Sequence, residues 1–155
     1  MLFLAGWSAS AQQLQVKDLV SLRAKSLDEI KSTLASKGWV YAGRRNDGES
    51  LQRYSFNAGD GKNSLAAVVY VDVDQEGNQA LEYSVFRKSL ISQLQNNLKT
   101  AAMKFIRKDT LSDNVELKLY EKNGAVLVTR GSAPKEYFSV KVHSKHNFKR
   151  LQAAM

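Results

Sequence analysis

The sequence predicts an α+β fold in which helices cover one face of a long antiparallel sheet. A capping box at Ser26-Leu27-Asp28-Glu29 begins a helical segment. Four short segments of strand-like composition, separated by turns, follow it. A second helical segment and four more strand-like segments then repeat this order. The sequence therefore predicts two helix-plus-four-stranded antiparallel meanders in tandem.

Three helices are expected. The first spans residues 18–24. The second begins after Ser26, because the serine hydroxyl and the Glu29 carboxylate each satisfy an unpaired backbone N–H, and Gly38 ends it in the left-handed conformation. The third spans residues 88–104. Its apolar stripe consists of Ile91, Leu94, Leu98, Ala101 and Ala102.

Eight strands are expected from runs of apolar and β-branched residues that end at turn residues. Turns such as Glu76-Gly77-Asn78 separate the strands of the first group, and Asn123-Gly124 is a strong two-residue hairpin signal in the second. The expected strands span residues 39–45, 51–57, 65–73, 81–86, 105–108, 115–122, 125–130 and 137–144.

The two halves of the chain match when the sequence is shifted along itself. Residues 12–155 are predicted to form a single α+β domain of two pseudo-repeats, at about 18–86 and 88–146, with no linker between them. Chance alignment of apolar periods remains the alternative. A shift of 64 places the helical residues Leu27, Ile30 and Leu34 on Ile91, Leu94 and Leu98, and a shift of 66 places the strand residues Trp39, Leu51 and Tyr54 on Phe105, Leu117 and Tyr120.

The first eleven residues have the features of the end of an export signal. Residues 2–7 are apolar but too few to span a bilayer, and no other stretch is long and apolar enough for a membrane helix. Ala9-Ser10-Ala11 fits the small-x-small pattern that signal peptidase cleaves. A buried N-terminal helix is the alternative. Residues 1–11 are therefore predicted to be a residual signal peptide, and the protein to be periplasmic or secreted in a Gram-negative bacterium.

The chain carries 23 Lys and Arg residues against 15 Asp and Glu residues, a formal net charge of +8. Such an excess favours anionic partners, among them a glycan, a lipid headgroup or an acidic protein. The predicted export from the cell argues against nucleic acid as the partner. The basic residues are dispersed, and only residues 145–150 form a local cluster. A solvated surface that maintains solubility is therefore the competing explanation.

The sequence lacks the recognisable constellations of an enzyme. It has no cysteine, no Gly-x-Ser-x-Gly elbow and no phosphate-binding glycine loop. Spacing alone leaves open a pair of facing carboxylates, as in a glycosidase. We expect no enzymatic activity and no cofactor.

Two segments have metal-ligating residue types, and neither predicts a site. His143 and His146 lack a third strong ligand, so both are expected to be exposed and incidental. Residues 72–78 begin like a calcium loop, but Tyr83 stands where a bidentate Glu is needed. We expect a hairpin turn at 72–78 and no bound metal.

Residues 65–73 are apolar on both faces of their strand, which a strand with water on one side should not be. In one interpretation, the N-terminal segment or the mate in a homodimer covers the second face. In the other, the second face receives a partner. The aromatic residues assigned to this candidate partner-binding face are Tyr54, Phe56, Tyr70 and Phe86, and the basic residues around it are Arg44, Arg53 and Arg87.

The segment DLVSLRAKSLDEIKSTLASKGWVYAGR, residues 18–44, resembles the opening of a large group of exported bacterial α+β proteins without assigned function. Their shared pattern is a short helix, a capped helix, Lys-Gly-Trp and an aromatic-rich meander, and the match extends to about residue 57. The tandem arrangement is also similar, in topology alone, to the β-lactamase inhibitory protein. That resemblance implies a sheet face that grips another protein, and it supplies no site residues.

We therefore expect an exported, non-enzymatic binding module whose open sheet face holds a protein or a cell-envelope component. The alternative is a module that binds an anionic ligand, such as a glycan or a lipid headgroup, through basic surface residues. Salt separates the two, because exposed charge pairs weaken as the ionic strength rises and apolar contacts do not.

Overall fold

The computed structural model describes residues 13–48, 50–59, 65–111, 114–132 and 134–154. Its eight strands form one antiparallel sheet in the order β1-β2-β3-β4-β8-β7-β6-β5. The strands are β1 (Val40–Asn46), β2 (Leu51–Gly59), β3 (Leu65–Asp74), β4 (Gln79–Val85), β5 (Lys104–Thr110), β6 (Glu116–Lys122), β7 (Ala125–Ser132) and β8 (Tyr137–Ser144). The helices are α1 (Val16–Arg23), α2 (Leu27–Ser36), α3 (Lys88–Thr100) and α4 (Lys145–Ala154). The predicted α+β class is confirmed, and the expected export signal at 1–11 lies outside the described residues.

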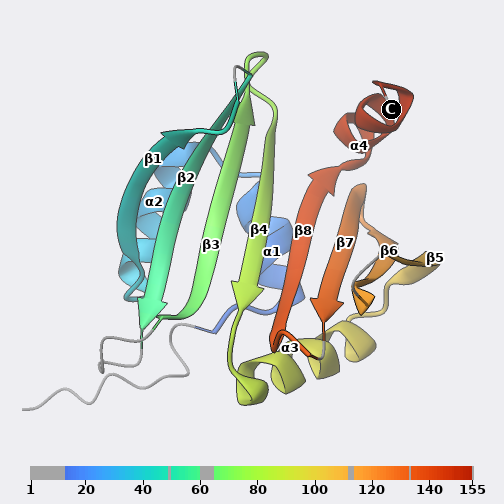
Figure 1. The fold of residues 1–155 in the computed structure, drawn as a ribbon. Helices are drawn as coiled ribbons and strands as arrows, with labels where there is room; N and C mark the ends of the chain where they lie inside the picture. The colour runs from blue at the N-terminus through green and yellow to red at the C-terminus, as the bar shows by residue number, and fades with distance from the viewer. Residues whose placement is uncertain (1–12, 49, 60–64, 112–113, 133, 155) are drawn as a thin grey trace, which may run out of the picture.

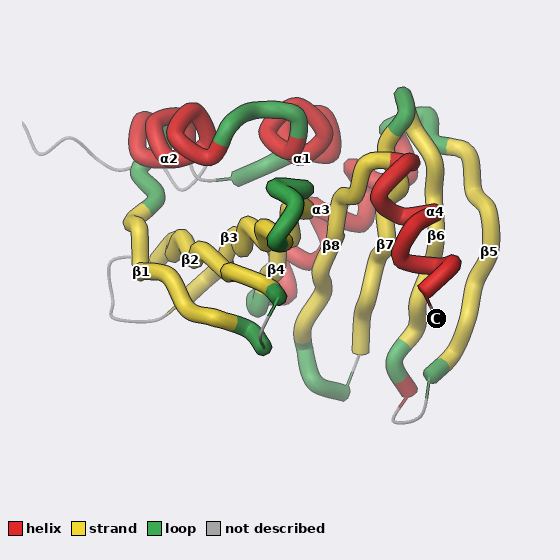
Figure 2. Tube along the Cα trace, turned by 90° about the horizontal axis from the view of Figure 1, so that it is seen from above, coloured by secondary structure: helices red, strands yellow, loops and turns green. Residues whose placement is uncertain are grey.

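The helices α1, α2 and α3 share one side of the sheet. In Figure 1, α1 and α2 pass behind the strands, and α3 lies across the lower end of the sheet. Figure 2 shows α1 and α2 along one side of β1–β4. We call the side that these three helices cover the rear face, and the side toward the reader in Figure 1 the front face. The fourth helix, α4, packs against β8 and β7 near the upper end of the sheet.

The start and the end of α2 follow from local sequence. The Ser26 hydroxyl oxygen accepts a hydrogen bond from the Glu29 N–H at 3.3 Å, and the Glu29 carboxylate accepts one from the Ser26 N–H at 2.9 Å. Gly38 has a φ of +85°, and the Trp39 N–H after it donates back to the Leu34 carbonyl at 3.0 Å. The predicted capping box and glycine stop are both confirmed.

The core lies between the rear face and the helices. Because side chains alternate along each strand, every second residue of the central strands points to the helices. Each fully buried aliphatic side chain contributes about 1.5–3 kcal/mol relative to an exposed one. Those that are fully buried include Leu19, Ile30 and Leu34 on the helices and Val69, Val71, Leu81, Leu127, Val140 and Val142 on the strands.

The two four-stranded groups are joined by β4 and β8, the last strand of each. Glu82 of β4 lies opposite Lys141 of β8 near the middle of the paired segment. On the rear side α1 packs against both strands. Asn97 of α3 accepts a hydrogen bond from the Val16 N–H at the start of α1, at 2.7 Å. The halves therefore share one sheet and one core.

Both edge strands carry a register shift at a corresponding place. Tyr41 of β1 pairs with Phe56 just before the shift, and Phe105 of β5 pairs with Tyr120 just before its own. The two pairs lie 64 residues apart in sequence, whereas the strands were expected to match at an offset of 66. The offset of 66 places Trp39, which is buried before β1, on the exposed Phe105.

We expect Leu81→Ala to lower the free energy of unfolding by about 2–5 kcal/mol, because it leaves a cavity where β4 meets α1 and β8. Leu81 is 0% exposed. Leu65→Ala is the matched control, because it deletes the same atoms at a site that is 44% exposed. Urea unfolding of both variants checks this expectation, and equal losses would contradict the placement of the core.

Candidate functional site

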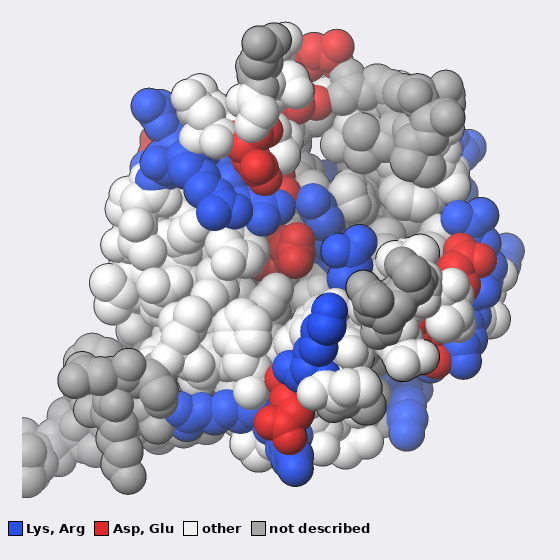
Figure 3. Space-filling model, viewed as in Figure 1, with Lys and Arg blue, Asp and Glu red and all other residues white. Residues whose placement is uncertain are grey.

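A cluster of charged side chains lies at the centre of the front face. Asp72 of β3 is 3% exposed. Arg53, its cross-strand neighbour on β2, donates from Nε to one carboxylate oxygen at 2.7 Å and from Nη2 to the other at 2.8 Å. Lys141 of β8 donates from Nζ to the same carboxylate at 2.9 Å. Figure 3 shows acidic and basic atoms meeting in the middle of this face.

The protonation states in this cluster are set by its geometry. Burial alone would raise the pKa of Asp72, but the hydrogen bonds from Arg53 and the charge of Lys141 outweigh it, so that the pKa is lowered. The hydrogen bonds to Asp72 also raise the pKa of Arg53. Both groups therefore stay charged, and each is neutralised within the protein.

This cluster uses two of the residues assigned to the candidate partner-binding face. The Arg53 guanidinium lies over the Tyr70 ring, 4.6 Å from its centroid, and its Nη2 is 3.9 Å from a Glu82 carboxylate oxygen. Arg53 thus binds Asp72 and stacks on Tyr70 within the chain. These ion pairs link β2, β3, β4 and β8, so the Arg53 cation is not available to a partner.

The remaining aromatic residues of the expected face do not join Tyr70. Phe56 is 2% exposed in the core on the rear face. Tyr54 also faces the rear, where Lys31 of α2 lies 5.5 Å from its ring centroid. The expectation that both share the front face is wrong. Residues two apart on a strand point to the same face, and in β2 the face that carries Tyr54 and Phe56 is the one toward the helices.

The other expected residues are dispersed. Phe86 is exposed after β4, Arg44 is exposed on the edge strand β1, and Arg87 is the N-cap of α3. On the front face of β3, Val68 and Ala66 are 3% and 8% exposed. The chain itself therefore buries the apolar residues that raised the expectation of an open surface.

A larger opening lies on the rear face of the second half. A cavity of about 1220 Å³ separates α3 from β5–β8. Its apolar and aromatic lining includes Ile91 and Leu98 from α3 and Met103, Phe105, Tyr120 and Tyr137 from the segments facing it. We call this opening the α3 groove. None of its residues belongs to the face expected from the sequence.

An aromatic pair spans the two outermost strands in each half of the sheet. The Tyr41–Phe56 rings have centroids 5.3 Å apart, and Lys31 Nζ of α2 is 5.1 Å from the Tyr41 ring centroid. The Phe105–Tyr120 rings have centroids 5.7 Å apart and line the open groove. The ring on the edge strand is exposed in both pairs, Tyr41 at 46% and Phe105 at 53%. The pairs differ in the inner ring, because Phe56 is 2% exposed and Tyr120 is half-buried.

The backbone around the α3 groove is strained. Among the described residues, four that are not glycine have positive φ, and three of these, Ala102, Asn114 and Glu136, line the groove. Asn adopts this conformation readily, but Ala and Glu do so at a cost of about 1–2 kcal/mol each. Such strain gathers at functional sites. Backbone strain thus distinguishes this groove, in addition to its apolar and aromatic lining.

Both carboxylates that line the α3 groove are paired with lysines. Lys88 lies 3.3 Å from the Glu136 carboxylate. Glu116 accepts from Lys118 at 2.8 Å and from Lys108 at 2.7 Å. These contacts lower the pKa of Glu116, so it stays ionised at neutral pH. The groove therefore presents apolar and aromatic surface, and lysines neutralise both of its carboxylates.

The two histidines lie in different surroundings. His143 is 8% exposed, against the expectation that it is exposed, because the Phe148 ring of α4 lies over it with the ring centroids 5.7 Å apart. Burial, followed by the charge of Lys141, lowers the pKa of His143 to about 4. His146 is exposed on α4. No group of three or more His, Cys, Asp or Glu residues suited to a metal occurs within the described ranges.

The segment that resembles half of a calcium loop is the β3–β4 hairpin turn. The Asp74 carboxylate accepts hydrogen bonds from the backbone N–H groups of Glu76 and Asn78, both at 2.9 Å. Gly77 has a φ of +82°. The expected hairpin turn is confirmed.

We expect Asp72→Asn to lower the free energy of unfolding by about 3 kcal/mol, because it leaves Arg53 and Lys141 without their shared counter-charge. The matched control is Asp109→Asn, which removes an exposed pair with Arg107 at 3.1 Å and should cost less than about 1 kcal/mol. Denaturant unfolding at neutral pH measures both. A loss no larger at Asp72 than at Asp109 would contradict the structural role of the front-face cluster.

We expect His143→Leu to reduce the acid sensitivity of the fold. Because the folded-state pKa is lowered from 6.5 to about 4, unfolding takes up a proton in this range, and stability that is complete above pH 6.5 is lost as the pH falls toward 4. The loss amounts to at most about 3 kcal/mol. Unfolding followed from pH 7 to 4 should show a smaller decline for His143→Leu and an unchanged decline for His146→Gln, and equal declines in all three proteins would contradict it.

Among the described residues no helix is both long and apolar enough to span a membrane. Comparisons of the chain with protein-family models, with curated proteins and with solved structures found no match.

Proposed function

We propose that this protein is a non-enzymatic binding module that holds an extended segment of a partner protein in the α3 groove. The observation that carries the proposal is the open rear face of β5–β8, where the Phe105–Tyr120 pair lines a cavity of about 1220 Å³. Apolar pockets with a few polar groups are the usual binding sites of proteins. The open sheet face expected from the sequence is thus assigned to the second half of the sheet.

The edge of the sheet favours an extended partner. All seven residues of β5 are exposed, and of the described strands only β6 pairs with it. An extended segment that adds to such an edge gains main-chain hydrogen bonds, and every second side chain points to one face. From the outer edge of β5 those side chains reach the α3 groove beside Phe105. Ile106, which is 45% exposed, adds apolar surface to the same edge.

We also propose that the two meanders are copies of one structural unit. The offset of 64 residues between the Tyr41–Phe56 and Phe105–Tyr120 pairs supports this.

We further propose that the module works in the periplasm or outside the cell. The Ala9-Ser10-Ala11 pattern and the absence of cysteine support this location. The resemblance of residues 18–57 to exported bacterial α+β proteins points the same way. In that setting the partner is a protein of the cell envelope or of the medium.

The test is selection of a phage-displayed library of random peptides on the folded protein, followed by fluorescence polarisation of the labelled peptides. We expect apolar residues at every second position of the selected peptides. Phe105→Glu should weaken binding by at least about tenfold, or about 1.4 kcal/mol. Binding should persist up to about 1 M salt, where charges are screened beyond about 3 Å.

Two further variants make this test specific. Tyr41→Glu places the same charge beside the corresponding aromatic pair in the first half and should leave binding unchanged. Gln95→Trp fills the α3 groove from an exposed position on α3 and should block binding. Failure to select any peptide, or equal losses from Phe105→Glu and Tyr41→Glu, would overturn the proposal.

A further inference from the structure

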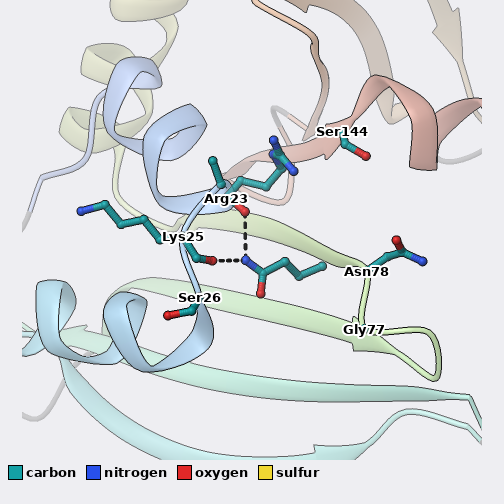
Figure 4. Close-up of a pocket in the computed structure, with 8 residues that line it drawn as sticks. Arg23, Lys25, Ser26, Gly77, Asn78 and Ser144 are labelled. Carbon is teal, nitrogen blue, oxygen red and sulfur yellow. Dashed lines mark hydrogen bonds between the residues drawn. The ribbon is translucent and has the colours of Figure 1, made fainter.

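A separate pocket lies at the other end of the molecule from α3. Its volume is about 460 Å³. Three segments distant in sequence line it: the turn between α1 and α2, the β3–β4 hairpin and the end of β8. Figure 4 shows Arg23, Lys25 and Ser26 on the first segment, Gly77 and Asn78 on the second and Ser144 on the third. None of these residues contributes to the α3 groove.

Among the described residues, the lining of this pocket is basic and neutral, without a carboxylate. Its charged residues are Arg23 and Lys25. In Figure 4 the Arg23 side chain points toward Ser144, whereas Lys25 extends away on the other side of the turn. Lys25 acts instead on Glu29, whose pKa it helps to lower after the larger effect of the hydrogen bonds from Ser26. Arg23 is therefore the cation that faces the pocket.

The Arg23 guanidinium lacks an anionic partner within the described part of the chain. Its Nε atom is buried and has no hydrogen-bond partner there. A buried N–H without an acceptor is unfavourable, and in a native structure it calls for an explanation. A molecule in the pocket cannot reach this buried atom, but Arg23 as a whole is only partly buried, so its terminal Nη groups are the donors that face the pocket. The geometry of a guanidinium, with its parallel N–H groups, suits two oxygens of one anion.

Hydrogen bonds from the sheet hold the backbone of the turn that carries Arg23. The Gln79 side-chain amide of β4 donates to the Arg23 carbonyl at 2.9 Å and also to the Lys25 carbonyl, as the dashed lines in Figure 4 show. One residue of the sheet thus holds the turn from which Arg23 projects. Such preorganisation reduces the ordering cost of binding.

The opposite wall of the pocket adds a hydroxyl and a helix start. The Ser144 hydroxyl oxygen accepts the Asn147 N–H of α4 at 3.0 Å, which leaves its own O–H to donate. The start of α4 places the positive end of a helix dipole beside Ser144. Burial and then the charge of Lys141 lower the pKa of His143, Asp72 opposes them, and Arg23 makes the smallest contribution, which also lowers it.

We propose that this pocket binds the phosphate group of a small molecule or of a lipid headgroup, with Arg23 as the principal donor and the Ser144 hydroxyl as the second. A cavity of about 460 Å³ is larger than a bare phosphate ion, so it accommodates part of the molecule that carries the phosphate. The proposal does not depend on the α3 groove, which lies on the rear face at the other end of the sheet.

The first experiment is a titration of the ¹⁵N-labelled full chain with inorganic phosphate at constant ionic strength. We expect saturable shifts of the Arg23 Nε–H signal and of the Gly77 and Ser144 amides. Arg23→Gln should weaken binding by at least about tenfold, and Arg23→Lys should weaken it less. Arg130→Gln, which removes the same charge from an exposed site on β7, should bind as the wild type does.

The second experiment distinguishes the two sources of phosphate. The protein is sedimented with vesicles of phosphatidylglycerol and phosphatidylcholine, and with vesicles of phosphatidylcholine alone. Co-sedimentation that requires phosphatidylglycerol and Arg23, and that free phosphate reverses, assigns the site to a lipid headgroup. Saturable phosphate binding without co-sedimentation assigns it to a soluble phosphate ester. Shifts that do not saturate, or equal losses from Arg23→Gln and Arg130→Gln in proteins that remain folded, would overturn the proposal.

Discussion

The pairing of β4 with β8 is the constraint on which the rest of the structure depends. These strands end the two four-stranded groups, and their union makes one sheet with one core. Both sides of the sheet reinforce the junction. On the front face, Asp72 binds Arg53 and Lys141, so three strands share one buried carboxylate. On the rear face, α1 packs across both strands.

The candidate sites follow from unequal covering of this sheet. Two helices cover the rear face of the first half, and α3, which lies across the lower end of the sheet, leaves the second half partly open. The α3 groove is lined by apolar and aromatic side chains and its two carboxylates are paired, whereas the pocket at Arg23 is polar and positively charged. The two surfaces thus suit ligands of different chemistry at opposite ends of one sheet.

Short-range sequence patterns predicted the positions of most helices and strands well. The site was predicted less well, because it depends on contacts between residues distant in sequence. Capping boxes, glycine turns and period-two alternation are short-range features, and eight strands and three helices were placed from them. The polar helix α4 lacks such signals and was missed. Alternation showed that Tyr54 and Phe56 share a face but not which face the helices cover. The partner of Arg53 and the orientation of α3 depend on contacts distant in sequence.

The central junction also has a consequence for the order of folding. Each meander forms from neighbouring strands, but Leu81 must find Val142, about 60 residues later, so that contact is slow to form. During synthesis, the first meander emerges with β4 as an unprotected edge that carries the apolar Leu81, Tyr83 and Val85. Exposed apolar edges are templates for aggregation. The nascent chain is therefore most prone to aggregation after β4 has formed and before β8 has been synthesised. A chaperone that binds unfolded chains would protect it during this interval.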